Sequence, residues 1–357
     1  MALDAEWENF MINGDDAEYD NKNVFPNKHF IPKFSDIYIS TQTKIGYLNS
    51  AVNLEEIFWK LPIIDYKDAR VGIIKKIIKI NSQTEEEVVK LEENIKSERH
   101  ISYDIINQIN TQTGNVKKFK DIRKIICGIS KKDLINFRKK KKSAFYNCFA
   151  VIIRIYFNNK FNEINIKLFN TGKLEIPGIQ NIKTLNIAVK ILLDIIEDSS
   201  GKKFHYLKNK VETVLINSNF SCNFFIIRNK LYNILKFKYN IHSLFDPCSY
   251  PGIQCKFYYN KENIQNDGVC KCENKCNLNK KKKKLNKCKI ISFMIFRTGS
   301  ILIVGNCDEE IIHIIYNFII NILKKELFNE IITKKIEGKK KNKKKYRKRI
   351  IKFTNLL

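Results

Sequence analysis

The sequence has few of the residues and motifs on which common enzyme classes depend. Its five histidines are scattered, no glycine-rich loop of the kind that cradles phosphates is present, and no carboxylates cluster with the spacing of a metal site. We therefore expect a binding protein rather than an enzyme, with no small-molecule substrate.

Long hydrophobic runs are also absent. The longest, near residues 311–323, contains His313 and Asn317 and is too short to span a bilayer. No signal peptide is recognisable, and ten cysteines in such a chain indicate a reducing compartment. We expect a soluble, intracellular protein that makes no use of a membrane.

Acidic residues are strongly outnumbered by basic ones. The chain has 65 Lys and Arg against 37 Asp and Glu, a formal net charge of +28 and a sequence pI near 9.6. Such an excess favours anionic partners, meaning nucleic acid or an anionic membrane surface. Lys, Asn and Ile are abundant throughout, as an AT-rich coding sequence would also give, so the charge alone decides little.

One stretch of the sequence occurs twice. NIKLFNTGKLEIPG occupies residues 165–178, and SFMIFRTGSILIVG occupies residues 292–305. Each copy predicts a strand, a tight turn at the Thr-Gly pair and a second strand, followed by a long helix of apolar periodicity. A repeat of this size predicts an α+β fold built from a duplicated unit. The positions that match without a gap are Phe169, Thr171, Gly172, Leu174, Ile176 and Gly178 in the first copy and Phe296, Thr298, Gly299, Ile301, Ile303 and Gly305 in the second.

Each copy has two faces, because side chains alternate across a strand. If helices cover one side of the sheet, the other side is open to a ligand, although strands buried on both faces would have the same composition. The face expected to pack against helices carries Ile166, Leu168, Leu174 and Ile176, and Phe293, Ile295, Ile301 and Ile303. The opposite face carries Lys167, Phe169, Glu175 and Pro177, and Met294, Phe296, Leu302 and Val304.

The duplicated pattern, an apolar residue and Phe before a Ser/Thr-Gly turn and an alternating strand that ends in Gly, resembles the TATA-box-binding protein family. In particular it resembles the divergent TATA-binding-protein-like factors of large DNA viruses. Three further stretches support the resemblance: residues 250–253 (YPGI), 148–154 (CFAVIIR), and the pairs Ile216-Asn217 and Ser221-Cys222. The resemblance as a whole covers about residues 37–327, interrupted by two insertions.

The resemblance implies a saddle, in which a curved antiparallel sheet carries helices on its convex face and binds A·T-rich promoter DNA in the minor groove. By this match Phe169 and Phe296 are the hairpin phenylalanines that wedge between bases, with Tyr250 as the second-half partner and Cys148 or Phe149 as the first-half partner. The match also pairs Lys256 with Arg154 as equivalent residues of the two halves, and both are expected to meet phosphate oxygens at the sheet edge. The remaining DNA contacts that the match implies are Asn217, Lys173, Met294, Leu302 and Val304.

The first half departs from the family pattern. Lys167, Glu175 and Pro177 stand at positions that are apolar, Val and Thr in the family, and the alignment places Ile37 where the family has its first central Asn. A carboxylate facing a phosphate-lined groove is repelled unless it is paired, for which Lys167 is available. We therefore expect an asymmetric saddle. Its second half inserts aromatic side chains between bases as in the family, and its first half binds DNA differently or weakly.

The chain is expected to divide into an acidic flexible arm (1–33), a first half (34–200), a second half (201–335) and a basic tail (336–357). Two insertions interrupt the halves, at about 67–142 and about 260–288. GIIKKIIKI, residues 72–80, fits a strand or a helix equally well. The RKKKK run at 138–142 favours phosphate contact over nuclear import or a solvated turn.

The second insertion contains four cysteines, Cys270, Cys272, Cys276 and Cys288, with the spacing C-x-C-x3-C-x11-C. In a reducing compartment four thiolates in one loop favour one structural Zn²⁺, while a flexible cysteine-containing loop without metal is the alternative. We expect no other cofactor.

The resemblance favours a transcription initiation factor that binds double-stranded DNA as a monomer and recruits RNA polymerase and other initiation factors. It would act in a nucleus or in a cytoplasmic viral factory. Two alternatives keep the fold: a non-sequence-specific architectural or virion DNA-binding protein, which the charge of +28 would suit, and a protein-interaction module for transcription factors.

Overall fold

The computed structural model describes residues 32–98, 100–113, 116–135, 146–262, 265–273, 276, 287–327 and 331–333. Most of the expected acidic arm, the basic run at 138–142 and the basic tail lie outside this described part, as do the side chains of residues 111–118.

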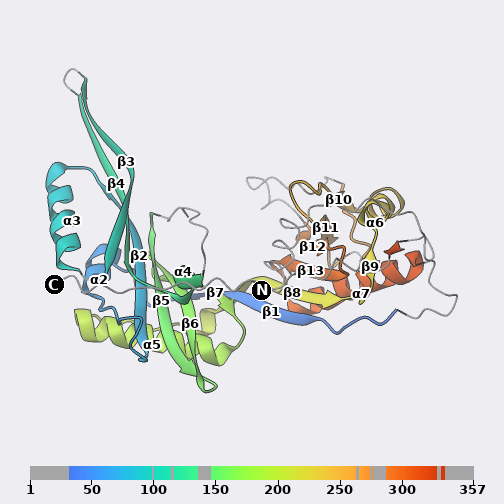
Figure 1. Cartoon of the computed structure of the whole chain (residues 1–357), viewed down its shortest axis with the longest axis horizontal. Coiled ribbons are helices and arrows are strands. Elements are labelled where there is room, and N and C mark those ends of the chain that lie inside the picture. Colours follow the sequence, from blue (N-terminus) through green and yellow to red (C-terminus); the bar gives the residue numbers. More distant parts are fainter. Residues whose placement is uncertain are drawn as a thin grey trace, which may run out of the picture.

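A single large antiparallel sheet runs through both halves of the chain (Figure 1). The first half contributes β1 (Tyr38–Tyr47), α2 (Leu54–Lys60), β2 (Gly72–Ser82), α3 (Glu85–Ser97), β3 (Ile101–Thr113), β4 (Val116–Gly128), α4 (Lys131–Ile135), β5 (Cys148–Phe157), β6 (Lys160–Phe169), β7 (Lys173–Ile179) and α5 (Ile182–Ser200). The second half contributes η1 (Lys208–Lys210), β8 (Glu212–Ser221), β9 (Phe225–Ile226), α6 (Arg228–Asn233), the π-helix η2 (Ile234–Lys238), β10 (His242–Leu244), β11 (Ile253–Tyr259), β12 (Lys289–Ile295), β13 (Ser300–Gly305), α7 (Glu309–Glu326) and β14 (Ile332–Thr333).

The strand order shows that the fold is duplicated. The twelve strands of the sheet follow the order β10-β11-β12-β13-β8-β1-β7-β6-β5-β2-β4-β3. Read outward from the centre, β1-β7-β6-β5-β2 repeats β8-β13-β12-β11-β10, and a long helix, α5 or α7, follows the last strand of each half. The sheet is curved, and its strands change direction from β1 and β8, which run across the view at the centre, to β3 and β4, which run upward at one end (Figure 1). The predicted α+β class and curved antiparallel sheet are therefore confirmed.

The two Thr-Gly turns occupy equivalent places and fix the alignment of the halves. Gly172 and Gly299 have φ angles of 79° and 82°, in the left-handed region that favours glycine. A Cβ at either position would strike a backbone carbonyl, that of Ser50 or Phe224. The amide of Leu48 donates to the Gly172 carbonyl at 2.8 Å, and the amide of Cys222 donates to the Gly299 carbonyl at 2.9 Å. Leu48 and Cys222 are thus equivalent residues.

The segment GIIKKIIKI forms a strand and belongs to the repeated unit. β2 pairs with β5 at the outer side of the first half, as β10 pairs with β11 in the second. The part of the chain without a counterpart in the second half therefore begins after Ser82, and not at about residue 67 as expected. That part adds α3, the β3–β4 pair at the sheet edge and α4.

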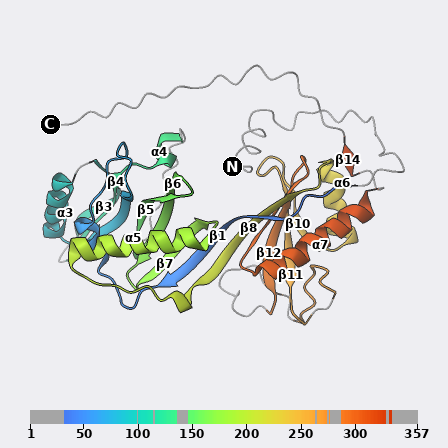
Figure 2. The same ribbon diagram turned by 90° about the horizontal axis from the view of Figure 1, so that it is seen from below.

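The long helices cover one face of the sheet, where two separate hydrophobic cores lie. Seen from below, α5 and α7 lie on the near side of the sheet in the two halves (Figure 2). The eight residues predicted to face the helices are each at most 1% exposed, four in the first core and four in the second. In the described part of the chain, no helix combines the length and apolar character needed to cross a bilayer.

Helix starts follow from side-chain caps. The carboxamide oxygen of Asn53 accepts from the amide of Glu56, the hydroxyl of Thr84 from that of Glu87, and the carboxamide of Asn181 from that of Lys183. Each cap satisfies an amide that the first turn of a helix leaves without a partner.

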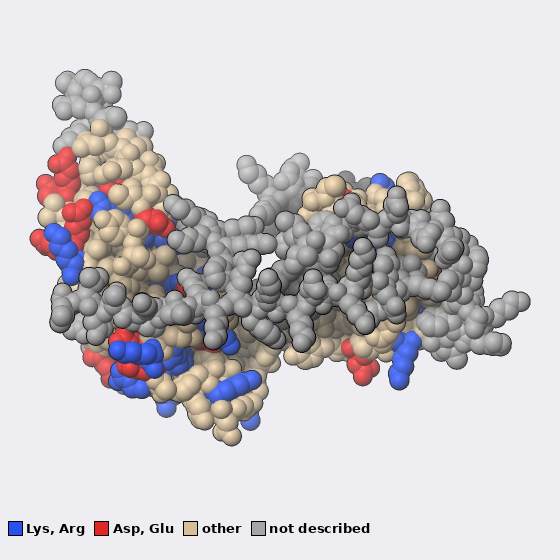
Figure 3. All heavy atoms as spheres, in the orientation of Figure 1, with Lys and Arg blue, Asp and Glu red and all other residues tan. Residues whose placement is uncertain are grey.

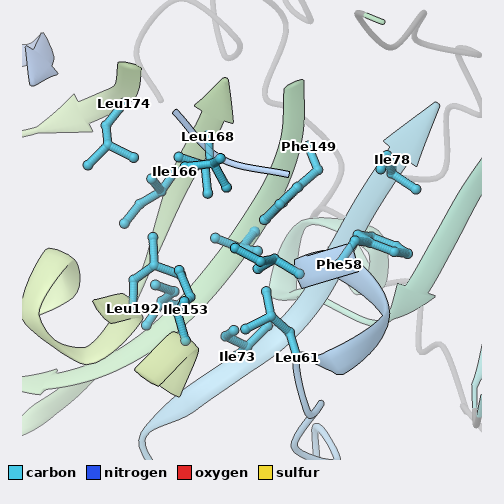
Figure 4. Packing of buried hydrophobic residues seen from close by; sticks show 14 of the residues in the cluster. Phe58, Leu61, Ile73, Ile78, Phe149, Ile153, Ile166, Leu168, Leu174 and Leu192 are labelled. Atoms are coloured by element: carbon cyan, nitrogen blue, oxygen red, sulfur yellow. The ribbon is translucent and has the colours of Figure 1, made fainter. Parts of the chain in front are cut away.

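Phe149 belongs to the first core, so its predicted DNA contact is wrong. Its side chain is fully buried in a row with Val151, Ile153 and Ile155, and its ring lies 5.9 Å from that of Phe58 on α2. Figure 4 shows Phe149 among the buried side chains of this core, which also include Phe58 and Ile78. Alternation along β5 turns this row to the helices and the next residues to the opposite face.

Replacing Phe149 with alanine should lower the free energy of unfolding by about 3–5 kcal/mol, because a fully buried ring leaves a cavity between β5 and α2. Denaturant unfolding measures the loss. Phe237→Ala, which removes a phenylalanine that is 71% exposed, is the matched control. Equal, small effects of the two substitutions would contradict the placement of Phe149 in the core.

Candidate nucleic-acid interface and metal centre

The face of the sheet opposite α5 and α7 brings together the predicted contact residues other than Phe149. Strand register places those that lie on strands, while Tyr250 and Phe296 lie just outside β11 and β12 and pack against each other. We call this the open face. It carries Cys148 opposite Phe169, Lys167 opposite Glu175, Met294 opposite Leu302, Asn217 opposite Val304, and Lys256 opposite Ser292, together with Arg154, Lys173 and Phe296.

At the end of the second half, Phe296 and Tyr250 form an aromatic pair. Their ring centroids lie 5.9 Å apart with the planes tilted by 57°. Phe296 is only 3% exposed, and a Cβ on Gly252 would lie 3.0 Å from its ring. Glycine at 252 thus allows the Tyr250 segment to close over Phe296.

A buried arginine holds the Tyr250 segment in place. Arg228, at the start of α6, is 5% exposed and donates to the carbonyl of Pro251. Its guanidinium also lies 5.1 Å from the centroid of the Phe245 ring. The amide of Tyr250 donates to the carbonyl of Asp246 at 2.9 Å, which closes the loop before β11. The aromatic pair is therefore supported from the helix side.

In the first half the register identifies Tyr146 as the equivalent of Tyr250. Cys148 stands opposite Phe169, and Ile253 stands opposite Ile295, so that Gly252 occupies the place of Cys148. Tyr146 is half exposed, and the ammonium of Lys79 lies 3.6 Å from the centroid of its ring. The sequence comparison missed Tyr146 because it matched Arg154 with Lys256, which is two residues out of register.

The first-half residue equivalent to Asn217 also differs from the residue expected from the sequence. Since Leu48 is equivalent to Cys222, Thr43 and not Ile37 is equivalent to Asn217. Ile37 instead packs against the second core. The carboxamide of Asn217 donates to the hydroxyl of Thr41 at 3.0 Å, directly across the β1–β8 ladder.

The expected phosphate contacts of Arg154 and Lys256 are not symmetric. Lys256 donates to the hydroxyl of Ser292 at 2.7 Å on the open face. Arg154 is 5% exposed and donates to the carbonyls of Asp68 and Tyr66 at 2.5 and 2.9 Å. With both carbonyls bound and its charge buried, Arg154 holds the 66–68 segment against the sheet and is not available to phosphate as predicted.

The open face of the first half is partly occupied by protein groups. The ammonium of Lys167 lies 2.6 Å from the carboxylate of Glu175, which is the pairing expected from the sequence. Short helix α4 sits over the outer strands, where Asp133 binds Lys75 on β2 at 2.7 Å. The α4 amide of Lys131 donates to the carboxylate of Glu163 on β6 at 3.0 Å. The described second half shows no equivalent of α4.

Charged side chains of the described residues are unevenly distributed on the face seen in Figure 3. Acidic side chains gather over α3, at the outer edge of the first half and away from the central strands (Figure 3). α3 begins with Glu85, Glu86 and Glu87. An anionic partner is therefore directed away from this edge.

The four predicted cysteine ligands meet in one cluster between β11 and β12. Their Sγ atoms all lie within 4.8 Å of one another. The separations are 3.5 Å between Cys272 and Cys288, 3.9 Å between Cys272 and Cys276, and 3.9 Å between Cys270 and Cys288. Four sulfurs at about 2.3 Å from a tetrahedral Zn²⁺ lie about 3.8 Å apart. The cluster can therefore hold a metal ion.

Hydrogen bonds lower the pKa of one of these cysteines, Cys270. The amide of Cys276 donates to Sγ of Cys270 at 3.5 Å. Burial acts to raise the pKa of Cys270, but hydrogen bonds from Cys276 and Cys272 outweigh it and lower the pKa to about 7. The thiolate, which is the ligating form, is thus accessible near neutral pH.

A comparison with curated proteins supports the family resemblance. A protein named "TATA-box-binding protein-like" from Acanthamoeba polyphaga mimivirus is 30% identical over 204 residues, which cover 52% of this chain and 50% of the relative. The chain thus spans about half the length of this curated relative. The resemblance to the TATA-box-binding protein family is confirmed, and the relative is named for binding DNA rather than for a catalysed reaction.

Among solved structures, "Methanococcus jannaschii TBP" aligns with 83% of this chain and 100% of its own, at 12% identity and a TM-score of 0.36. Superposition at that level is loose, so the fold assignment rests on the strand order and register of this chain. No protein-family model matches the chain.

Replacing Arg228 with methionine should loosen the Tyr250 segment, because the buried carbonyl of Pro251 loses its donor. We expect a loss of about 1–3 kcal/mol in stability and faster amide exchange at residues 250–253, measured by hydrogen exchange. Arg70→Met, at an exposed arginine paired with Asp68, is the control. Unchanged exchange at 250–253 in the Arg228 variant would show that another contact holds the loop.

Proposed function

We propose that this protein is a TATA-binding-protein-like transcription initiation factor that lays the open face of its sheet on A·T-rich duplex DNA. One observation carries the proposal: a single continuous face has aromatic residues at equivalent positions in both halves. These are Phe296 with Tyr250 in the second half and Phe169 with Tyr146 in the first. The name of the curated relative supports the same function.

The chemistry of the face suits the minor groove. Between the two aromatic positions lie uncharged residues such as Thr41, Asn217, Leu302 and Val304. The minor groove offers a degenerate pattern of acceptors, so a face of this kind reads A·T-rich DNA mainly through the ease with which it bends and widens. Aromatic side chains inserted between bases then hold the bend.

The two halves are proposed to bind differently. In the second half Tyr250 covers Phe296, which is only 3% exposed, and Arg228 supports the pair, so Tyr250 has to move aside before Phe296 can wedge between bases. In the first half the cations of Lys173 and Lys79 lie over the rings of Phe169 and Tyr146. Those cations would meet phosphates, which favours backbone contact over wedging there.

RNA polymerase and initiation factors are the proposed protein partners, with the factor acting as a monomer on DNA in a nucleus or a viral factory. The net charge of +28 favours one alternative, an architectural protein that binds duplex DNA of any sequence. Sequence preference at fixed salt distinguishes the two functions.

Phe296→Ala should weaken binding to an A·T-rich duplex by about tenfold or more, since a wedge of this kind is worth more than about 1.4 kcal/mol. Phe169→Ala should weaken it by less than about threefold. Fluorescence anisotropy at fixed salt measures both, and Phe237→Ala, on the exposed surface of η2, is the control.

Equal losses for the two variants would contradict the asymmetry between the halves. No measurable duplex binding by the unmodified protein would contradict the proposed function and favour a protein-interaction module.

We further propose that the four-cysteine cluster holds one structural Zn²⁺. The purified protein should retain about one Zn²⁺ per chain. Cys276→Ser should lose the metal and unfold the loop between β11 and β12, whereas Cys248→Ser, at an exposed cysteine outside the cluster, should retain it. Metal content by mass spectrometry decides this, and full retention of Zn²⁺ in the Cys276 variant would contradict the site.

A further inference from the structure

We propose that a groove between the cysteine loop and α7 binds an extended, acidic peptide segment of a partner protein. The groove has a volume of about 670 Å³ and lies between residues 265–271, the turn after η2, and one side of α7. Its outer wall is the loop that the cysteine cluster ties down, so the inference rests on the proposed metal site for the order of that wall.

The floor of the groove is apolar and fixed. Ile314 and Phe318 lie one turn apart on α7, and Val269 faces them from the loop. The ring of Phe318 packs edge-on against Phe257 of the second core at 5.1 Å. The amide of Tyr258 donates to the carbonyl of Gly268 at 3.0 Å, which attaches the loop to the end of β11. A rigid apolar floor can seat one side chain of a ligand.

The rim of the groove is rich in carboxamides. Asn240, Asn317 and Asn321 line it, with Asn317 and Asn321 one turn apart on the exposed side of α7. The carboxamide oxygen of Asn266 is buried there and accepts no hydrogen bond from the residues that the structure describes. Each carboxamide offers both a donor and an acceptor, which matches the alternating N–H and C=O groups of an extended peptide backbone.

The charges at the groove favour an acidic ligand. Asp267 is paired with Lys271 at 2.7 Å, so its charge is compensated within the loop. Lys325, in the last turn of α7, forms no ion pair within the described residues and remains available to a carboxylate. The local excess is therefore positive, and a segment with an apolar side chain next to Asp or Glu fits both the floor and the rim.

The place of the groove allows it to act while DNA is bound. It lies against α7, on the face of the sheet opposite Phe296 and Leu302. A peptide in the groove would therefore not compete with a duplex on the open face. The chain can join a DNA site and a protein partner through opposite sides of its second half.

Selection of short random peptides by phage display on the full-length, zinc-loaded protein tests this inference. Enriched peptides should carry Asp or Glu beside Phe, Leu or Ile. Asn321→Trp, which fills the groove, should weaken a selected peptide by about tenfold or more, and Lys325→Glu should weaken it by at least about threefold. Lys324→Glu, at the neighbouring exposed residue on α7 that points away from the groove, should leave binding unchanged.

Several results would overturn the inference. If the selected peptides bind the wild-type protein and the Asn321→Trp variant equally well, their binding site is not the groove. Displacement of the peptides by duplex DNA would make the groove part of the nucleic-acid site. If Asn321→Trp weakens peptide binding but removal of the metal ion does not, the metal ion is not needed to order the wall of the groove. Duplex binding by the same variants, expected to be unchanged, separates a failed groove from a failed DNA-binding function.

Discussion

The pairing of β1 with β8 is the interaction on which the rest of the structure depends. Each half has its own hydrophobic core, and the two cores share no residue, although Ile37, just before β1, and Ile39 of β1 pack against the second core. The β1–β8 ladder, with Thr41 opposite Asn217 and Thr43 opposite Leu215, joins these halves into one sheet. Because side chains alternate, its register also decides which residues face the helices and which face the open side. The ladder contains two register shifts, between Ile39 and Thr41 and between Thr43 and Lys44, and the pairing between them sets Thr41 and Thr43 on the same face as Asn217.

The parts of the fold that depend on local chemistry could be predicted from the sequence. The Thr-Gly pairs identified two turns, since glycine adopts the backbone angles found at Gly172 and Gly299 without steric cost. The period of two in the flanking strands separated the buried rows from open-face residues such as Phe169 and Val304, which are partly exposed. The four cysteines met as their spacing in one loop suggested.

The parts that depend on long-range pairing could not be predicted in this way. The first-half equivalent of Tyr250 is Tyr146 and not Phe149, because hydrogen bonding sets Cys148 opposite Phe169, whereas a motif match ignores the lengths of the hairpin strands. Thr43 was missed for the same reason. The sequence predicts that Arg154 binds phosphate. In the structure the segment after α2 folds back, and Arg154 donates to the carbonyls of Asp68 and Tyr66 in that segment. The insertion also places α4 on the first-half face, a contact that no local pattern reveals.

The central claim is that the open face bends A·T-rich DNA mainly through the second half of the sheet. A titration of end-labelled A·T-rich and G·C-rich duplexes with a bend-sensitive FRET readout, over a series of salt concentrations, tests it most directly. We expect tighter binding to the A·T-rich duplex, with a large FRET change that persists as salt weakens the affinity. Equal, strongly salt-dependent binding of both duplexes without a FRET change would contradict the claim and leave a basic protein that binds DNA without bending it.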